Sequence, residues 1–275
     1  MYVFINWDVS PEIVNFGFWA LRYYSLFFAS GFIISHYIMQ DIFRRDGRTM
    51  EELDSLTIYM IGATIIGARL GHCLFYEPEY FLKHPLEILQ VWNGGLASHG
   101  ATVGILLALY FFSKKANVPY LWILDRIVIV VALCGGLIRL GNLMNSEIVG
   151  KPTDVPWGFI FLQNGENFAR HPAQLYESIS TFILFGFLWY LYLKTDLKNK
   201  TGLIFGIFCA ILFSLRIYYE FLKENQVEFE DQMALNMGQI LSIPMVVVGI
   251  FFILRSYNKQ NVQPSEISSQ TKSEL

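Results

Sequence analysis

Long apolar runs separated by shorter polar stretches dominate this chain of 275 residues. A helix needs about 20 apolar residues to cross a bilayer core about 30 Å thick. Seven runs approach that length, and we expect them at Phe16–Tyr37, Leu56–Phe75, Ser98–Ser113, Leu121–Leu140, Leu175–Leu193, Leu203–Leu222 and Gln239–Leu254. The pattern predicts an all-α, polytopic integral membrane protein with seven transmembrane helices.

The basic residues of the connecting loops alternate between a rich side and a poor side. One set of loops holds eleven, namely Arg44, Arg45, Arg48, Lys114, Lys115, Lys194, Lys198, Lys200, Arg255, Lys259 and Lys272. The other set holds four, namely Lys83, Lys151, Arg170 and Lys223. Because cytoplasmic loops collect positive charge, the N-terminus is expected outside and the C-terminus in the cytoplasm.

The chain divides into a long membrane part and a short tail. We expect residues 1–259 to form a seven-helix transmembrane domain, and residues 260–275 a polar, disordered cytoplasmic tail. The longer outward loops, Tyr76–Ala97 and Gly141–Gln174, cannot leave their backbone unsatisfied in hydrocarbon. They are therefore expected to cap an outward-facing polar cavity. The N-terminus lacks the basic region and cleavage site of a signal peptide.

Composition supports the membrane assignment and excludes one class of partner. Hydrophobic residues make up 54% of the chain and the mean hydropathy is +0.41, which is too apolar for a soluble domain of this size. The formal net charge of -3 provides no basic surface for nucleic acid. Cys73, Cys134 and Cys209 lie in apolar runs without metal-binding or redox spacing, and we expect them to be buried packing residues.

Five arginines fall within or at the rim of the expected spans: Arg22, Arg69, Arg126, Arg139 and Arg216. A charge at the centre of a membrane helix costs about 2.5–3.5 kcal/mol on insertion scales, so each needs a partner, water or a ligand. Arg126 is expected to reach the cytoplasmic interface and Arg22 the outer one. For Arg69, between Gly67 and Gly71, a structural and a functional role are both open, and the glycines predict close helix approach.

Two of these arginines have neighbours that suggest a binding site. Arg139 is followed by Asn142, Asn145 and Glu147 near the outer end of its span. Arg216 lies four residues before Glu220, which fits either a simple intrahelical ion pair or part of a site. Guanidinium groups match the geometry of phosphate oxygens. The two arginines could therefore hold one phosphate, and a phospholipid headgroup is the phosphate most available at that depth.

Two further segments carry polar groups near the same face. In WNGGLASHGATVG, Trp92–Gly104, His99 is either a general base or a helix-interface residue, and the glycines allow close approach of a ligand or helix. In RHPAQLYES, Arg170–Ser178, Pro172 fits the first turn of a span that turns Gln174 and Glu177 inward. We interpret this second segment as a structural helix start.

The segments WNGGLASHG, GLIRLGNLMNSEIVGKP, RHPAQLYE and MGQILSIP occur in this order on the expected spans. From about Leu21 to about Pro244 the chain resembles the prolipoprotein diacylglyceryl transferase family. The resemblance implies an enzyme of the bacterial inner membrane whose active site faces the extracytoplasmic side. It would transfer the diacylglyceryl group of phosphatidylglycerol to the lipobox cysteine of a prolipoprotein. It would form a thioether and release glycerol 1-phosphate, without a metal or organic cofactor.

The resemblance also implies roles for individual residues. The catalytic residues would be His99 as base, with Arg139 and Arg216, and the phosphatidylglycerol-binding residues would be Arg139, Asn142, Glu147, Gly150, Tyr24 and Glu220. The chain departs from the family pattern at three positions: Tyr23, Ala101 and Leu212. No role carries over to Leu212, where the family often has tyrosine.

Two other classes of protein remain as alternatives. A phospholipid or anion transporter also needs intramembrane arginines, but would show polar lining at both sides of the bilayer. An intramembrane protease would need a Ser/His or paired-Asp arrangement. Ser98 and His99 are adjacent, and Asp125 is the only clear aspartate within a span.

Overall fold

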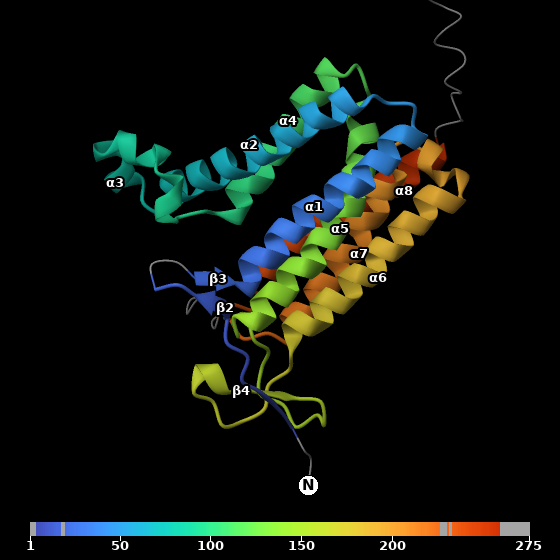
Figure 1. Cartoon of the computed structure of the whole chain (residues 1–275). Helices are drawn as coiled ribbons and strands as arrows, with labels where there is room; N and C mark the ends of the chain where they lie inside the picture. Colours follow the sequence, from blue (N-terminus) through green and yellow to red (C-terminus); the bar gives the residue numbers. More distant parts are fainter. Residues whose placement is uncertain (1–3, 18–19, 226–229, 231–232, 259–275) are drawn as a thin grey trace, which may run out of the picture. The chain divides into compact units, whose positions relative to one another are not determined.

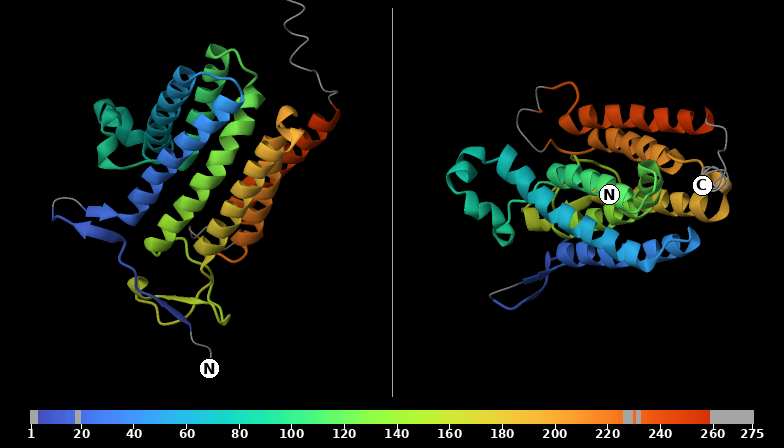
Figure 2. Two further views of the ribbon diagram at one scale, coloured as in Figure 1. Left: turned by 45° about the vertical axis from the view of Figure 1, so that its right-hand side comes forward. Right: turned by 90° about the horizontal axis from the view of Figure 1, so that it is seen from above.

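The computed structural model describes residues 4–17, 20–225, 230 and 233–258, and most of these are helical (Figures 1 and 2). Six described helices are long and apolar enough to cross a membrane: α1 (Tyr23–Arg45), α2 (Met50–Phe75), α5 (Tyr120–Met144), α6 (Ala173–Lys194), α7 (Leu203–Glu220) and α8 (Met237–Asn258). This confirms an all-α polytopic membrane protein. The expected tail, residues 260–275, lies outside the described residues.

The third expected span corresponds to α4 (Ser98–Lys115), which is not among those six helices. Its 18 residues include His99, Lys114 and Lys115, and these polar ends lower its hydropathy. The count of seven transmembrane helices therefore stays a prediction.

The bounds predicted for the first span were wrong at both ends. Residues Glu12–Asn15 (β2) and Ala20–Arg22 (β3) form an antiparallel pair, and α1 then runs on to Arg45. Hydropathy alone does not separate an apolar strand pair from the start of a helix, and the polar side chains after Tyr37 ended the apolar run too early. The expected interfacial position of Arg22 fits its place in β3, where it is exposed and pairs with Glu12 at 3.3 Å.

The start of α2 was predicted six residues too late because a capping box extends the helix. The Thr49 hydroxyl accepts a hydrogen bond from the Glu52 backbone N–H, and the Glu52 carboxylate accepts one from the Thr49 N–H. Two of the free N–H groups at the helix start are thereby satisfied. Hydropathy cannot register these polar residues as part of a membrane helix.

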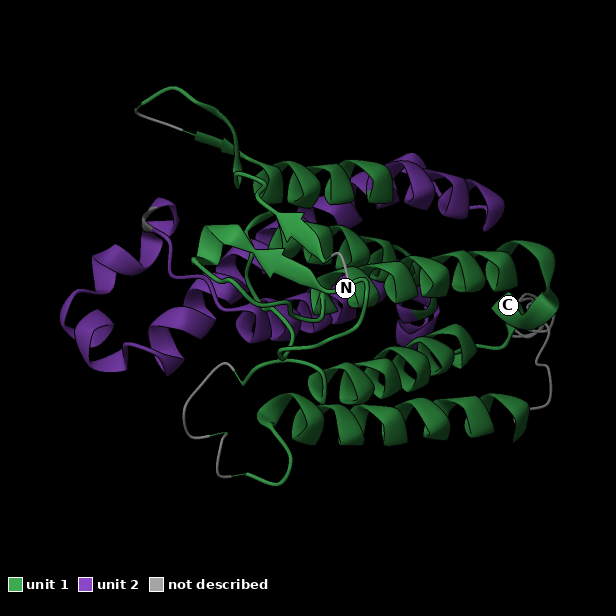
Figure 3. Ribbon diagram, turned by 90° about the horizontal axis from the view of Figure 1, so that it is seen from below, with its two compact units in different colours: residues 1–35, 125–275 green, residues 36–124 purple. Residues whose placement is uncertain are grey.

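The chain forms two compact units, Met1–Ser35 with Asp125–Leu275, and His36–Leu124 (Figure 3). In the first unit, α7 packs closely on α8 through small residues. A Cβ added at Gly206 would lie 2.9 Å from the Gly249 oxygen, and one at Gly249 would lie 2.5 Å from the Ala210 nitrogen. Asp125 accepts hydrogen bonds from the backbone nitrogens of Gly202, at 2.6 Å, and Phe205, at 2.8 Å. This buried carboxylate caps the start of α7.

A small core covers the C-terminal end of α5 within the first unit. Strand β1 (Ile5–Trp7) pairs in parallel with β4 (Phe159–Phe161), and Trp7 stacks on Phe159 with ring centroids 5.3 Å apart. Leu143, Phe159 and Phe161 are buried together there. The Trp7 indole N–H donates to the Leu143 carbonyl at 3.1 Å, which satisfies one of the carbonyls left free at a helix end.

In the second unit, α2 and α4 meet along two glycine pairs with GxxxG spacing. A Cβ at Gly67 would lie 2.5 Å from the Gly100 oxygen, and a Cβ at Gly71 would lie 2.6 Å from the Gly100 Cα. Gly104 is equally close to α2, with 2.7 Å to the Ala63 oxygen. The predicted close approach at Gly67 and Gly71 is confirmed, because only glycine lets the backbones come this near.

The contacts of Arg69 decide between the structural and the functional role that its sequence position left open. Its side chain is buried and donates to the carbonyls of Glu87, at 2.7 Å, Gly94, at 2.8 Å, and Ile88, at 3.0 Å. The guanidinium also lies 5.0 Å from the centre of the Phe81 ring. Arg69 therefore holds α3 (Pro78–Lys83) and the following 3-10 turns, Pro85–Leu89 and Val91–Asn93, against α2. Its role in the described structure is structural.

Arg126 is buried in the protein, and its expected position at the membrane interface stays a prediction. Arg126 is only 4% exposed, and its guanidinium lies 5.8 Å from the centre of the Tyr192 ring. An aromatic face can receive a buried cation in place of water, and a sequence without known helix neighbours does not reveal it.

Candidate active site

The segment after α5 reverses sharply and brings Glu147 back over the helix. Ser146 and Ile148 both adopt positive φ angles, 52° and 56°, which are rare for a residue with a Cβ and rarest for a β-branched one. Glu147 Oε1 then accepts hydrogen bonds from Asn142 Nδ2, at 2.7 Å, and from Asn145 Nδ2, at 3.2 Å. Strained backbone of this kind is typical of a functional site.

Arg139 continues the same network toward α6. Its Nη1 donates to Asn142 Oδ1 at 3.2 Å, and its Nε lies 2.7 Å from Glu177 Oε2. Gln174, one turn before Glu177, donates to the Glu147 carbonyl at 2.6 Å. The structure thus brings Arg139, Asn142 and Glu147 together, as their spacing predicts. It also adds two residues from the segment interpreted as a helix start.

Lys223 connects this network to Arg216. Its Nζ lies 3.2 Å from Glu177 Oε1 and 2.6 Å from Glu220 Oε1, and the residue is only 2% exposed. Glu220 Oε1 in turn lies 3.8 Å from Arg216 Nε. The result is a continuous series of ion pairs, Arg139–Glu177–Lys223–Glu220–Arg216, which we call the charge chain. Its three cations and two carboxylates give a net charge of +1.

The start of α8 supports Glu220 from the other side. Asn236 Nδ2 donates to Glu220 Oε2 at 3.0 Å, and a Cβ at Gly238 would lie 2.7 Å from the Glu220 carboxyl carbon. Gln239 accepts from the Asn236 backbone N–H at 3.1 Å. Asn236, directly before the fourth motif, therefore bonds the Glu220 carboxylate, while Gly238 leaves room for it and Gln239 fixes Asn236. An isolated Arg216–Glu220 pair does not describe this arrangement.

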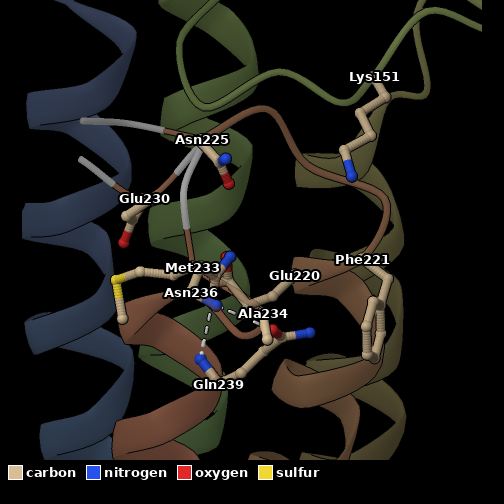
Figure 4. A pocket seen from close by; sticks show the side chains of 9 residues that line it. All are labelled: Lys151, Glu220, Phe221, Asn225, Glu230, Met233, Ala234, Asn236 and Gln239. Carbon is tan, nitrogen blue, oxygen red and sulfur yellow. Dashed lines mark hydrogen bonds between the residues drawn. The ribbon is translucent and has the colours of Figure 1, made fainter. Parts of the chain in front are cut away.

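A polar cavity of about 120 Å³ opens beside Glu220 (Figure 4). Its lining residues are Lys151, Glu220, Phe221, Asn225, Glu230, Met233, Ala234, Asn236 and Gln239. Glu220 is the member of the charge chain that lines it. The cavity therefore lies at the Glu220 side of the chain, and the two arginines are not part of its wall.

Gly150 lies where the chain passes beside Lys223. The two residues form an antiparallel β-bridge, and the Gly150 N–H donates to the His171 carbonyl at 3.0 Å. A Cβ at Gly150 would overlap that same carbonyl oxygen, so no side chain fits there. Gly150 thus keeps its place in the site by close backbone packing.

Arg170 fastens the same backbone. It donates to the Gly150 carbonyl at 3.1 Å and pairs with Glu166, at 2.8 Å, and Glu224, at 2.7 Å. Burial alone would lower the pKa of Arg170, but the hydrogen bonds to Glu166 and Glu224 raise it above its usual value. This arginine therefore stays charged and holds the segment next to Lys223.

A larger apolar groove of about 460 Å³ lies between α6 and α7. Its lining residues are Trp157, His171, Tyr176, Ile179, Ser180, Ile183, Tyr218, Tyr219 and Leu222. Tyr176, Tyr219 and Leu222 are the direct sequence neighbours of Glu177, Glu220 and Lys223. The apolar groove therefore borders the charge chain. Burial lowers the pKa of His171 on its wall.

Of the two remaining predicted site residues, Tyr24 lies in the first unit with Arg139 and His99 in the second. Tyr24 packs on Gly141 of α5, where a Cβ would lie 2.7 Å from the Tyr24 ring. His99 belongs to the second unit, at the second position of α4. It is exposed, and its ring lies 5.5 Å from that of Phe75 and 5.8 Å from that of Tyr76.

Ionisable residues that pair between the helices of a polytopic membrane protein, here next to a polar cavity and an apolar groove, are characteristic of a membrane protein with a function in its helical part. A family model described as prolipoprotein diacylglyceryl transferase matches residues 11–255. The chain belongs to this family. The resemblance drawn from the four sequence motifs is confirmed, and with it the expected enzyme class, a transferase.

Several relatives are similar over nearly their whole length, and each is named phosphatidylglycerol–prolipoprotein diacylglyceryl transferase. The protein from Chloroherpeton thalassium is 46% identical over 261 residues, which cover 94% of this chain and 97% of the relative. The Tolumonas auensis protein is 43% identical over 251 residues, covering 91% and 96%. The Porphyromonas gingivalis protein is 39% identical over 268 residues, covering 92% and 95%.

Proposed function

We propose that this chain transfers the diacylglyceryl group of phosphatidylglycerol to the lipobox cysteine thiol of a prolipoprotein. The observation that supports this most directly is the charge chain that joins Arg139 to Arg216 through Glu177, Lys223 and Glu220. Its two arginines present planar guanidinium groups, which match the oxygens of a lipid phosphodiester. The relatives, named for this activity, support the same assignment.

In the reaction, the carbon–oxygen bond at the sn-3 position of the lipid breaks and a carbon–sulfur bond forms. The bonding electrons leave with the phosphate, so glycerol 1-phosphate departs with one more negative charge than the diester carried. Arg139 and Arg216 stabilise this charge where it develops, and pre-placed donors of this kind make the largest contribution in many enzymes. Asn142 and Glu147 orient Arg139, Glu220 orients Arg216, and Tyr24 packs beside them.

The attacking sulfur must lose its proton, because a thiol is a weak nucleophile near its free pKa of about 8.5. His99 is the proposed base that receives this proton. Its exposed imidazole is available to a substrate group, whereas the buried ammonium group of Lys223 is engaged with Glu177 and Glu220.

The apolar groove between α6 and α7 suits an acyl chain of the lipid. Tyrosine and tryptophan rings present apolar faces with a polar edge, as is common where a membrane protein meets the headgroup region. A lipid with its tail in this groove would have its headgroup near the charge chain. Holding both membrane-anchored substrates in one place supplies the orientation that the transfer needs.

Membership of the family supports a bacterial inner membrane location, and the Lys and Arg distribution of the loops supports an active site on the extracytoplasmic side. On that side the enzyme would meet prolipoproteins as they emerge from the membrane. The N-terminus would then be outside and the C-terminus in the cytoplasm.

The function is tested by incubating the purified protein with phosphatidylglycerol and a lipobox peptide. The peptide is expected to gain the mass of one diacylglyceryl group, with an equal amount of glycerol 1-phosphate released. A peptide with serine in place of the cysteine is the control and should gain nothing. An unmodified cysteine peptide, under conditions in which the Chloroherpeton thalassium relative modifies it, would refute the proposal.

A further inference from the structure

Lys223 is the most deeply buried cation of the charge chain. It lies three residues after Glu220, just beyond the end of α7, and is 2% exposed, whereas the side chains of Arg139 and Arg216 are 24% and 45% exposed. A lysine this deeply buried is rare and needs compensating partners. Its Nζ has two, Glu177 and Glu220.

The two carboxylates that hold Lys223 are the same ones that hold the arginines. Glu177 uses Oε1 for Lys223 and Oε2 for Arg139. Glu220 uses Oε1 for both Lys223 and Arg216. Lys223 is thus the central link, and a shift of its ammonium group would move both carboxylates and, with them, both guanidinium groups.

We propose that Lys223 is a positioning residue that sets the spacing of Arg139 and Arg216 for the departing phosphate. The proposal rests on the function proposed above and adds a residue to it. Lys223 does not contact the substrate itself, because its ammonium group is enclosed by the two glutamates. It acts by fixing the two guanidiniums before the reaction, so that no reorganisation is needed when charge develops.

The backbone around Lys223 is anchored in a way that fits this role. Lys223 forms a β-bridge with Gly150, and the residues on either side of Lys223 bond to the residues on either side of Gly150. Leu222 accepts from the Lys151 N–H at 2.7 Å, and the Glu224 N–H donates to the Val149 carbonyl at 3.3 Å. A flexible four-carbon side chain is therefore held on a fixed backbone, which a centre for positioning other groups requires.

A simpler role would be neutralisation of two buried carboxylates, and two variants separate it from positioning. Lys223→Met removes the cation and leaves the chain with a net charge of 0. Adding Glu177→Gln returns the net charge to +1, but the link between the arginines stays broken. Lys194→Met, at an exposed position at the end of α6, is the matched control.

All variants are assayed for thioether formation at varied mole fractions of phosphatidylglycerol, together with their thermal unfolding. For Lys223→Met we expect kcat to fall about 10- to 100-fold, the range for misplaced catalytic groups, with a raised KM for the lipid. In Lys223→Met/Glu177→Gln, KM should recover with the net charge while kcat stays low. Lys223→Arg should retain most of kcat, since a guanidinium can bridge both carboxylates.

Recovery of kcat in the double variant would overturn the proposal, because net charge alone would then explain the effect. A kcat within twofold of wild type in a folded Lys223→Met would also overturn it. Lys223→Met leaves a surplus buried carboxylate, whereas the double variant has no such surplus and is expected to fold. If Lys223→Met does not fold, the kcat of the double variant alone decides: a low kcat supports the proposal and a recovered kcat overturns it. Wild-type protein that forms no thioether in this assay would instead refute the proposed function.

Discussion

Gly150 and Lys223 pair across two extended segments, so the last glycine of the segment GLIRLGNLMNSEIVGKP contacts the residue at the centre of the charge chain. We expect Gly150→Ala to displace this pair, because the added methyl group would overlap the His171 carbonyl. Overpacking of this kind destabilises by about 1–3 kcal/mol. The transfer rate should fall by more than the loss of folded protein explains. Enzyme kinetics and thermal unfolding, both measured in the same detergent, give the two quantities.

Gly165→Ala is the matched control for that substitution. Gly165 is exposed, with a φ of 72° and no atom within 4 Å of an added Cβ. It should lose some stability and little activity. A Gly150→Ala enzyme as active as wild type would show that close packing at this position is not required.

Replacing Arg139 by lysine should be almost as damaging as replacing it by alanine. Arg139 uses different nitrogens for Asn142 and Glu177, and an ammonium group cannot reproduce that fork. We expect kcat/KM to fall about 100- to 1000-fold, the range for loss of one transition-state donor. Arg22→Lys, at an exposed position in β3, is the control. An Arg139→Lys enzyme within threefold of wild type would remove Arg139 from the chemistry.

Arg69→Gln should affect folding of the second unit. The variant removes the charged donor of the part-buried hydrogen bonds to the carbonyls of Glu87, Ile88 and Gly94, and a hydrogen bond to a charged group contributes about 1.5–3 kcal/mol. Limited proteolysis should then cut between α2 and α4, where the wild-type chain is protected. Arg44→Gln, in the last turn of α1, is the control. Unchanged protease resistance in Arg69→Gln would contradict the structural role.

His99→Gln tests the proposed base. Loss of a general base lowers the rate by about 100- to 10000-fold, and the rate should then depend more steeply on pH above neutrality, where the free thiol ionises. His84→Gln changes another exposed histidine of the second unit and should leave the rate unaltered. Substantial transfer by His99→Gln or His99→Tyr would exclude His99 as the sole base, without bearing on the family.

Local spacing in the sequence predicted one half of the candidate site. Arg139, Asn142 and Glu147 are close because a helix and one tight reversal join them, and Arg216 and Glu220 are one helical turn apart. Glu177 and Lys223 were not connected to them, since that requires knowing that α6 and α7 are neighbours. The spacing of Arg216, Glu220 and Lys223, four and three residues apart, was the available signal, because a helix continued to Lys223 would have them on one face, although α7 in fact ends at Glu220.

Errors in the predicted fold came from contacts that hydropathy does not encode. The first span was predicted to start too early because Phe16–Leu21 is as apolar as a helix start, and the contact of Arg126 with Tyr192 of another helix was not predicted. The glycines near His99 left close approach of a ligand or of a helix open, and Gly100 and Gly104 pack against α2. Composition and motif order were sufficient for the membrane class and the family.

The most direct test of the account is an experimental structure of the protein with phosphatidylglycerol bound. We expect the phosphate of one lipid to have oxygens within about 4 Å, the ion-pair limit, of guanidinium nitrogens from both Arg139 and Arg216. Lys223 should still bridge Glu177 and Glu220 in that complex. A lipid phosphate that contacts only one of the two arginines, or neither, would contradict the claim that they act together on the departing group.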